Sequence, residues 1–207
     1  MPEKKLLIFP CNGNGLEALD CVSNEYECIG FIDDTPEKLG KHPVGIEVYS
    51  RHILQRYPNA YVLAVPGSPS SYLRRKEFID SLQIEKKRFA RIIHPQAVIS
   101  SHATIGHNVL IMAGVVITSN AIIEDHICIL PNSVIHHDTK IGQYTLIGSG
   151  VIVAGYTVIE QNCYIGSGSR IINNITIGEN TLIGIGSTVL KNVLPYSKVA
   201  GTPARPI

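Results

Sequence analysis

The sequence predicts a chain of two parts: a small α/β domain of the Rossmann-like type over residues 1–92, followed over residues 93–207 by a stack of short parallel strands. Strand-like and helix-like segments alternate in the first part, which is typical of a parallel sheet covered by helices. In the second part, Ile or Val occupies every sixth position from Ile93 to Val189, seventeen times in succession. A period of six fits neither a helix nor an isolated strand, so it indicates an internal repeat.

Strands and helices are expected in turn along the N-terminal part. The predicted strands are apolar runs at residues 5–10, 28–34, 61–66 and 88–93, the last of which leads into the first repeat. The predicted helices cover residues 16–23, 52–57 and 70–84. In the last helix the apolar positions form one face, so the solvent side is expected to carry Arg74, Arg75, Lys76 and Glu77. Residues 35–50 are rich in Pro and Gly and are expected to form turns.

Glycines and short polar residues follow the predicted strands. Ligands of parallel α/β sheets bind at the carboxyl ends of the strands, so the expected binding residues are Asn12, Gly13, Asn14, Asp33, Asp34 and Gly67. Backbone amides of the loop at the helix start can hold a phosphate, and the two aspartates can bond a ribose or a base. The alternatives are an ordinary strand-to-helix turn and a solvated strand end, because the loop lacks the full dinucleotide-binding spacing.

Each hexapeptide of the second part has the composition of a short strand followed by a turn. Two positions before each Ile or Val, from Ile99 onward, the residues are small or β-branched and never charged, and glycine often follows the Ile. Stacked strands bury the Ile/Val column, with each coil paired to the next about 4.8 Å away. No single repeat buries its own face, so the array is stable only as a stack.

Composition and charge argue against several function classes. The net charge of +1 gives no electrostatic basis for binding nucleic acid or an anionic membrane. Few charged residues lie between Pro95 and Ile207, which favours outer faces covered by other subunits; alternatively, Asn, Ser, Thr and Gly supply enough polarity. The five cysteines, an odd number without a CxxC pair, favour neither disulfides nor a zinc site. No N-terminal apolar run is long enough for a signal peptide or membrane span, so a reduced, cytoplasmic protein is expected.

The repeat resembles that of the hexapeptide-repeat acyltransferases, in which three hexapeptides form one coil of a left-handed parallel β-helix. The glycine-containing loop, the strand end Phe31-Ile32-Asp33-Asp34 and the fused repeat together resemble the nucleotide-linked 4-amino-4,6-dideoxysugar N-acetyltransferases of the bacillosamine and perosamine type. Sialic-acid O-acetyltransferase-like proteins share this arrangement. The resemblance implies acetyl-CoA as acetyl donor, a nucleotide-linked amino sugar held by the N-terminal domain, and a homotrimer with active sites between subunits. The chain departs from this family at Pro10, where glycine is usual, and at Asn14, where histidine is usual.

One segment of the repeat, from Ser133 to Gly142, carries two adjacent histidines followed by an aspartate. The resemblance places the family's base on His137 and its acidic helper on Asp138. An imidazole suits this role because the attacking amine must lose a proton near neutral pH, and a carboxylate can orient the ring. Gly155 lies eighteen residues after His137, and the resemblance implies that its backbone N–H donates to the developing oxyanion. The alternative is that Gly155 only allows the chain to turn, like the other glycines of the repeat. A second family histidine aligns with Leu146 and is absent.

The expected coenzyme groove lies toward the C-terminal coils. The resemblance assigns it Gly184, Gly186, Lys191, Pro203 and Arg205. The cations would meet the coenzyme phosphates, although surface solubility explains lysines equally well. No grouping of His, Cys, Asp and Glu has convincing metal spacing, so no metal is expected.

The predicted function is acetyl-CoA-dependent N-acetylation of a nucleotide-linked 4-amino-4,6-dideoxyhexose, for surface polysaccharide or glycan synthesis, by direct transfer with His137 as general base. One rival is sugar O-acetyl transfer on the same scaffold, because a histidine base serves both reactions. A second rival belongs to another class: a non-catalytic β-helix, either a metal-binding protein of the γ-carbonic-anhydrase kind or a structural trimer.

Overall fold

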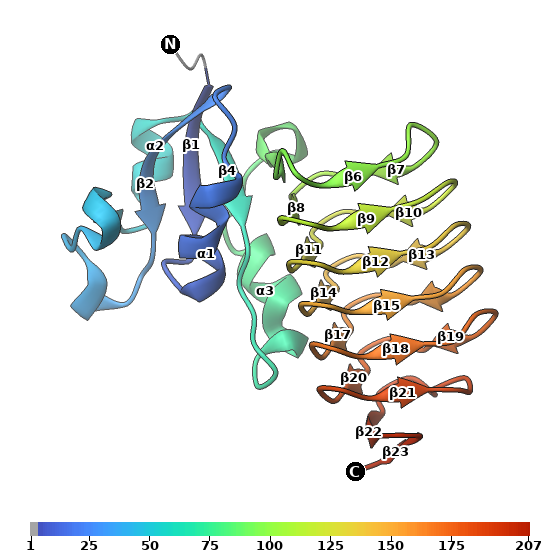
Figure 1. Ribbon diagram of the computed structural model, residues 1–207. Helices are drawn as coiled ribbons and strands as arrows, with labels where there is room; N and C mark the ends of the chain where they lie inside the picture. The colour runs from blue at the N-terminus through green and yellow to red at the C-terminus, as the bar shows by residue number, and fades with distance from the viewer. Residues whose placement is uncertain (1–3) are drawn as a thin grey trace.

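The computed structural model describes residues 4–207 and has two parts side by side (Figure 1). An α/β unit at the N-terminus lies against one side of a tall parallel β-helix. The chain leaves the α/β unit at one end of the β-helix and winds coil by coil to the other end. None of the described helices is long and apolar enough to cross a membrane.

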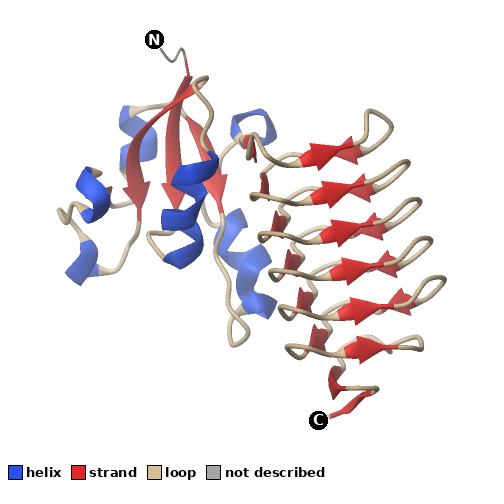
Figure 2. Cartoon of the chain, viewed as in Figure 1, coloured by secondary structure: helices blue, strands red, loops and turns tan. Residues whose placement is uncertain are grey.

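The α/β unit is built on a parallel sheet of four strands in the order β3-β2-β1-β4. The strands are β1 (Lys4–Phe9), β2 (Tyr26–Ile32), β3 (Val48–Tyr49) and β4 (Tyr61–Ala64). The α-helices are short: α1 (Gly13–Glu17), α2 (Ile53–Arg56) and α3 (Arg75–Asp80). Turns of 3-10 helix lie at Ala18–Cys21, Pro36–Lys38, Pro43–Gly45, Tyr72–Arg74 and Lys86–Arg88. Figure 2 shows α3 between this sheet and the β-helix.

Several expectations for this unit need correction, three of them in its secondary structure. The turn-rich segment contains a strand, β3, which pairs with β2 through Phe31 and Ile32. The strand expected at residues 88–93 is β5 (Arg91–Ile93), which pairs with β8 of the β-helix, and only Phe89, just before it, forms an isolated parallel bridge with Val62 of β4. The first helix begins at Gly13 rather than residue 16, because the Asn12 side chain caps it by accepting a hydrogen bond from the Gly15 N–H at 2.8 Å.

Three parallel sheets form the faces of the β-helix. The first sheet faces the α/β unit and contains β5, β8 (Val109–Ile111), β11 (Cys128–Ile129), β14 (Leu146–Ile147), β17 (Tyr164–Ile165), β20 (Leu182–Ile183), β22 (Lys198–Gly201) and the antiparallel β23 (Ala204–Pro206). The second sheet contains β6 (Val98–Ile99), β9 (Val116–Ile117), β12 (Val134–Ile135), β15 (Ile152–Val153), β18 (Arg170–Ile171) and β21 (Thr188–Val189). The third sheet contains β7 (Thr104–Ile105), β10 (Ile122–Ile123), β13 (Lys140–Ile141), β16 (Val158–Ile159) and β19 (Thr176–Ile177).

The Ile/Val column forms the core of the β-helix, as the period predicts. Residues such as Ile135, Val153 and Ile171 are at most 2% exposed and stack in register, one per coil. Most of the positions two residues earlier are also buried, and hydroxyls at some of them bond the next coil: Ser133 Oγ donates to the Gly148 carbonyl at 2.7 Å.

The joint between the two parts is apolar at its centre. Outward-facing Leu110, Cys128 and Leu146 of the first sheet pack in one cluster with Ile8 and Leu63 of the α/β unit. Leu146 is 2% exposed. The position where the family carries a second histidine therefore lies under the α/β unit and contributes to the joint.

Arg75, expected on the solvent side of its helix, is instead fully buried in this joint. Its guanidinium donates to the carbonyls of Tyr144 and His126, each at 2.9 Å, and to the carbonyl of Pro66. The N–H groups of Arg75 are thus satisfied by three carbonyl oxygens in place of a carboxylate. Burial lowers the pKa of Arg75 to about 10. Arg75 thus fastens α3 to two successive coils of the β-helix.

His126 belongs to the same joint. Its ring stacks on Tyr144 at a centroid distance of 4.6 Å and meets Phe89 edge-on at 5.0 Å. The Asn108 amide lies 3.1 Å from His126 Nδ1 and also bonds Ala64, extending the edge of β4. Burial lowers the pKa of His126 to about 4, so this ring is neutral at physiological pH.

Candidate active site

His137 and Asp138 occupy the corner where β12 passes into β13. His137 Nδ1 lies 2.8 Å from Asp138 Oδ2, and the Asn120 amide donates to Asp138 Oδ1 at 3.1 Å. The hydrogen bond from His137, followed by that from Asn120, holds the pKa of Asp138 below its usual range. The ionised carboxylate can only accept, so His137 Nδ1 carries the ring proton. The lone pair of Nε2 is then available on a side chain that is 51% exposed.

Gly155 lies one coil further along the same edge, stacked on His137 as the eighteen-residue register predicts. The Tyr156 N–H, next in sequence, donates to the His137 carbonyl at 3.1 Å. A Cβ atom at Gly155 would lie 2.7 Å from Cε1 and 2.8 Å from Nε2 of His137, so only glycine leaves room for the imidazole. No backbone or side-chain acceptor within residues 4–207 meets the Gly155 N–H. This donor is therefore unbonded beside the His137 imidazole.

Sequence reasoning missed two residues of this corner. Asn120 lies one coil before Asp138, and Tyr156 lies one coil after it. The Tyr156 ring meets the His137 ring edge-on, with centroids 5.1 Å apart and planes at 85°. Both could have been found from the eighteen-residue register, because they lie eighteen residues before and after Asp138. The register was used only for His137.

The α/β unit has an open cleft of about 690 Å³ at the carboxyl ends of its strands. Among the expected substrate residues, Asn12, Asp33, Asp34 and Gly67 line this cleft. Gly13 and Asn14 lie outside its lining. The Gly15 amide of the expected phosphate loop is already bonded by the Asn12 side chain, which removes one of the amides that the sequence suggested for a phosphate.

Both aspartates of the cleft have a cationic partner that the sequence did not indicate. Lys38 Nζ lies 2.8 Å from Asp33 Oδ2, and Arg51 Nε donates to Asp34 Oδ2 at 2.7 Å. Burial acts to raise the pKa of each carboxyl, but hydrogen bonds from these cations and from backbone amides outweigh it and lower both pKa values. Lys38 and Arg51 come from turns whose residues follow no periodic pattern, so only the folded chain brings them here.

A second groove, of about 460 Å³, lies at the C-terminal end of the β-helix and includes Lys191, Pro203 and Arg205 in its lining. The other two residues of the expected coenzyme set, Gly184 and Gly186, precede β21 and lie outside this lining. A Cβ atom at Gly184 would lie 2.7 Å from the Ala200 Cβ. Gly186 has a φ of +67°, which L side chains rarely adopt.

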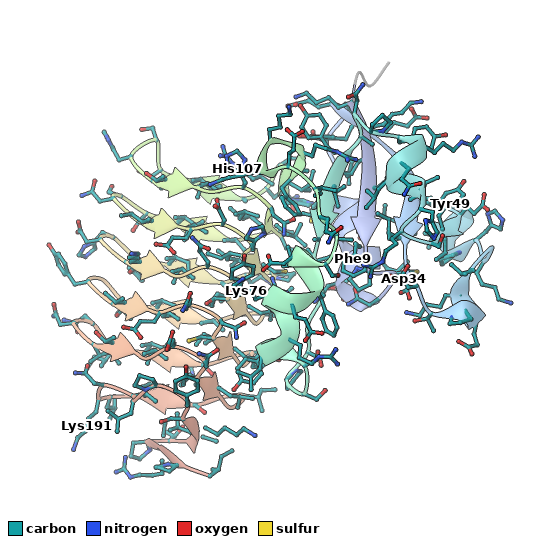
Figure 3. All side chains as sticks on the ribbon, turned by 180° about the vertical axis from the view of Figure 1, so that it is seen from behind. Phe9, Asp34, Tyr49, Lys76, His107 and Lys191 are labelled. Carbon is teal, nitrogen blue, oxygen red and sulfur yellow. The ribbon has the colours of Figure 1, made fainter. Side chains whose placement is uncertain are left out.

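These three places do not meet within one chain. The connection from β12 to β13 lies on the edge of the β-helix that points away from the α/β unit (Figure 1). Lys191 also lies far from Phe9 and Asp34, which mark the cleft (Figure 3). Lys191 follows β21, three coils beyond β12, which corresponds to about 14 Å along the stack.

The described part of the chain contains no group of three or more His, Cys, Asp or Glu side chains placed to share a metal ion. Its five cysteines are all free thiols.

A regular parallel β-helix built from six-residue repeats is the architecture typical of hexapeptide-repeat proteins. The family described as "Bacterial transferase hexapeptide (six repeats)" matches residues 120–155 and 156–193. The repeat that the sequence period predicts is therefore similar to this family over these two segments. A search of curated protein sequences gives no match.

Several solved structures resemble nearly the whole chain. The acetyltransferase domain of PglB from Neisseria gonorrhoeae, solved with acetyl coenzyme A, matches with a TM-score of 0.86 and 23% identity over 99% of both chains. PerB from Caulobacter crescentus, solved with CoA and GDP-perosamine, matches with a TM-score of 0.84 and 21% identity over 99% of this chain and 97% of that one. WeeI from Acinetobacter baumannii matches with a TM-score of 0.81 and 24% identity over 99% of both chains. The predicted fold class, an α/β unit followed by a left-handed parallel β-helix, is confirmed.

Proposed function

We propose that this protein is an acetyl-CoA-dependent N-acetyltransferase that modifies the amino group of a nucleotide-linked 4-amino-4,6-dideoxyhexose for surface polysaccharide or glycan synthesis. The observation that carries the proposal is the His137–Asp138 pair packed on Gly155: a base with a free Nε2 beside an unbonded backbone N–H. The solved relatives support it, because PglB is described as an acetyltransferase bound to acetyl coenzyme A and PerB was solved with GDP-perosamine.

In the proposed reaction the sugar amine attacks the thioester carbonyl carbon directly. His137 Nε2 accepts the proton that the nitrogen loses, while Asp138 holds Nδ1 and stabilises the imidazolium that forms. The Gly155 N–H donates to the developing oxyanion. When the tetrahedral centre collapses, the C–S bond breaks and the imidazolium returns its proton to the departing thiolate. One histidine and one backbone amide are sufficient for these reaction steps, and no acyl-enzyme forms.

We further propose that the active site forms between subunits of a homotrimer, with residues 1–92 and 93–207 acting as two domains. His137 belongs to the connection from β12 to β13, which lies on the edge of the β-helix that points away from the α/β unit (Figure 1), so we assign the nucleotide cleft to a neighbouring chain. The outward positions of the second sheet support contact between chains: Val98 and Ile152 are 63% and 38% exposed in the single chain, and both are apolar. A trimer would bury such side chains.

The coenzyme is proposed to lie along the edge that carries His137, Gly155 and Lys191. Its thioester would sit at His137, and its phosphates would lie toward Lys191 and Arg205. Gly184, Gly186 and Pro203 would border this path, since a backbone without bulky side chains lets a ligand approach closely. We also propose that the protein works in the cytoplasm, because its cysteines are unpaired thiols, which is typical of reducing compartments.

The test is an acetyl-transfer assay with UDP-, dTDP- and GDP-linked amino sugars, each matched with the corresponding hydroxy sugar. Release of the CoA thiol should occur with an amino sugar, and exclusive activity on a hydroxyl would support the O-acetyltransferase instead. His137→Ala should lower kcat about 10²- to 10⁴-fold, the range of a positioned general base, while acetyl-CoA binding persists in calorimetry. His136→Ala, at the neighbouring residue, is the matched control. Near-normal turnover by His137→Ala would remove His137 from the mechanism.

A further inference from the structure

Tyr156 has a backbone conformation that disfavours its residue type. Its φ is +58°, in the left-handed region where L side chains other than Asn, Asp and Gly are strained. The same corner of neighbouring coils carries Asn120, Asp138 and Asn174, with φ values of 59°, 57° and 60°. Tyr156 is therefore the exception in a position that the fold otherwise fills with Asn or Asp.

Two other tyrosines in the left-handed region each make a specific contact with their hydroxyl. Tyr144 Oη donates to Asp80 at 3.1 Å across the joint, and Tyr196 Oη donates to Glu179 at 3.1 Å. A strained residue persists where the surrounding structure holds it. Tyr156 is 57% exposed, so burial of its ring does not account for the choice of tyrosine.

The contacts of Tyr156 are with the base and its helper. Its ring meets the His137 ring edge-on at a centroid distance of 5.1 Å, and its N–H donates to the His137 carbonyl. The Asp138 carboxyl bonds His137 Nδ1 at 2.8 Å and the Asn120 amide at 3.1 Å, and these two groups, followed last by Tyr156, lower the pKa of Asp138. The His137 imidazole is thus bordered by Gly155, by Asp138 and by Tyr156.

This border matters because His137 is half-exposed. A surface side chain ordinarily samples several rotamers, and a base that leaves its productive orientation loses effective concentration toward the proton it must accept. Gly155 leaves the room for the ring, and Asp138 fixes one nitrogen. The edge-on contact with the Tyr156 ring is a further restraint on the rotamer of this side chain.

We propose that Tyr156 is a positioning residue for the base: its ring holds the His137 imidazole so that Nδ1 stays on Asp138 and Nε2 faces the acyl acceptor. The inference rests on the proposed acetyl transfer and adds to it. It identifies the strained tyrosine as a feature retained for activity at the expense of stability.

The variant Tyr156→Asn tests this inference, because Asn is the residue that the same corner carries at Asn120 and Asn174. The chain should fold and its Tm should not fall, since Asn relieves the left-handed strain; a rise of about 2–4 °C is expected. The kcat should fall about 10- to 100-fold with the KM for acetyl-CoA within twofold of the wild type. Tyr156→Phe, which keeps the ring, should retain most of the kcat. Tyr196→Asn is the matched control: it also removes a left-handed tyrosine but should leave kcat unchanged.

A second readout is independent of turnover. Spectra of ¹⁵N-labelled histidine, assigned with His137→Ala, should show His137 as a single tautomer protonated at Nδ1 in the wild type and as an averaged signal in Tyr156→Asn. If the wild type is active, and Tyr156→Asn has the same kcat and the same His137 signal as the wild type, the role of Tyr156 is overturned. The proposed acetyl transfer would still stand. A wild type inactive on every amino sugar would instead reject the proposed function, while the nitrogen spectra still decide whether Tyr156 orients the ring.

Discussion

Replacing Arg75 with Met should loosen the joint between the α/β unit and the β-helix. Met keeps the apolar stem but removes the guanidinium that serves the carbonyls of Pro66, His126 and Tyr144. Because Arg75 is 0% exposed, water cannot replace the lost donors without opening the joint.

The expected size follows from two opposing terms. Hydrogen bonds from a charged donor contribute about 1.5–3 kcal/mol each, so three bonds give roughly 5–9 kcal/mol. Burial lowers the pKa of Arg75 from 12.5 to about 10, which corresponds to about 3 kcal/mol against the charged form. The difference predicts a loss of roughly 2–6 kcal/mol in the free energy of unfolding.

Thermal unfolding at pH 7.5 measures this loss. At about 2–4 °C for each kcal/mol in a chain of this size, Arg75→Met should lower the Tm by roughly 4–24 °C. Hydrogen exchange should locate the change: amides of α3 should lose protection, while those of β12 and β15 in the second sheet, which carry none of these carbonyls, keep theirs. Lys76→Met is the control, because its exposed ion pair with Asp80 contributes about 0.5 kcal/mol at most. An Arg75→Met variant as stable as Lys76→Met would refute the reasoning.

Two further predictions concern acid stability and the coenzyme groove. The pKa of His126 is lowered by burial to about 4, below its unfolded value near 6.5, so the folded state resists protonation: stability should be full above pH 6.5 and fall by about 3 kcal/mol toward pH 4. His126→Asn, suited to the φ of +64° at this position, should lack that slope in Tm measured against pH; an unchanged slope would contradict the assignment. Replacing both Lys191 and Arg205 with Ala should raise the KM for acetyl-CoA about 5- to 30-fold with kcat retained. Lys87→Ala, in the α/β unit, is the control, and an equal KM for the double variant would exclude these cations from phosphate binding.

The β-helix could be predicted from the sequence because its core repeats without interruption. Each Ile or Val of the column meets an identical environment one coil away, so a single pattern specifies every coil and its partner. The same register predicted that Gly155 stacks on His137. Local periodicity was sufficient here because the tertiary contacts of this fold recur at a fixed spacing in sequence.

The joint could not be predicted by the same means. Helical periodicity assigns Arg75 to solvent because a charged residue flanked by other charged residues ordinarily forms a wet face. The acceptors that satisfy its guanidinium are mostly backbone carbonyls of residues far along the chain. Every residue has a carbonyl, so the residue types do not show which ones accept. A weaker signal did exist: outward positions Leu110, Cys128 and Leu146 are apolar at eighteen-residue spacing, which indicates that one face of the β-helix is covered.

The regularity of the β-helix also explains why its site is found in exceptions to the pattern. Every coil offers the same corner geometry, so packing alone would fill the corner after the second sheet with Asn or Asp at the left-handed position. At one coil, a histidine precedes the carboxylate, a glycine stacks on that histidine, and a tyrosine takes the strained position beside it. Two of the three departures follow from packing the imidazole: Gly155 makes room, and Tyr156 limits its motion. A corner that needed only stability would contain neither, which is why relieving the strain at Tyr156 should preserve the fold and reduce the rate.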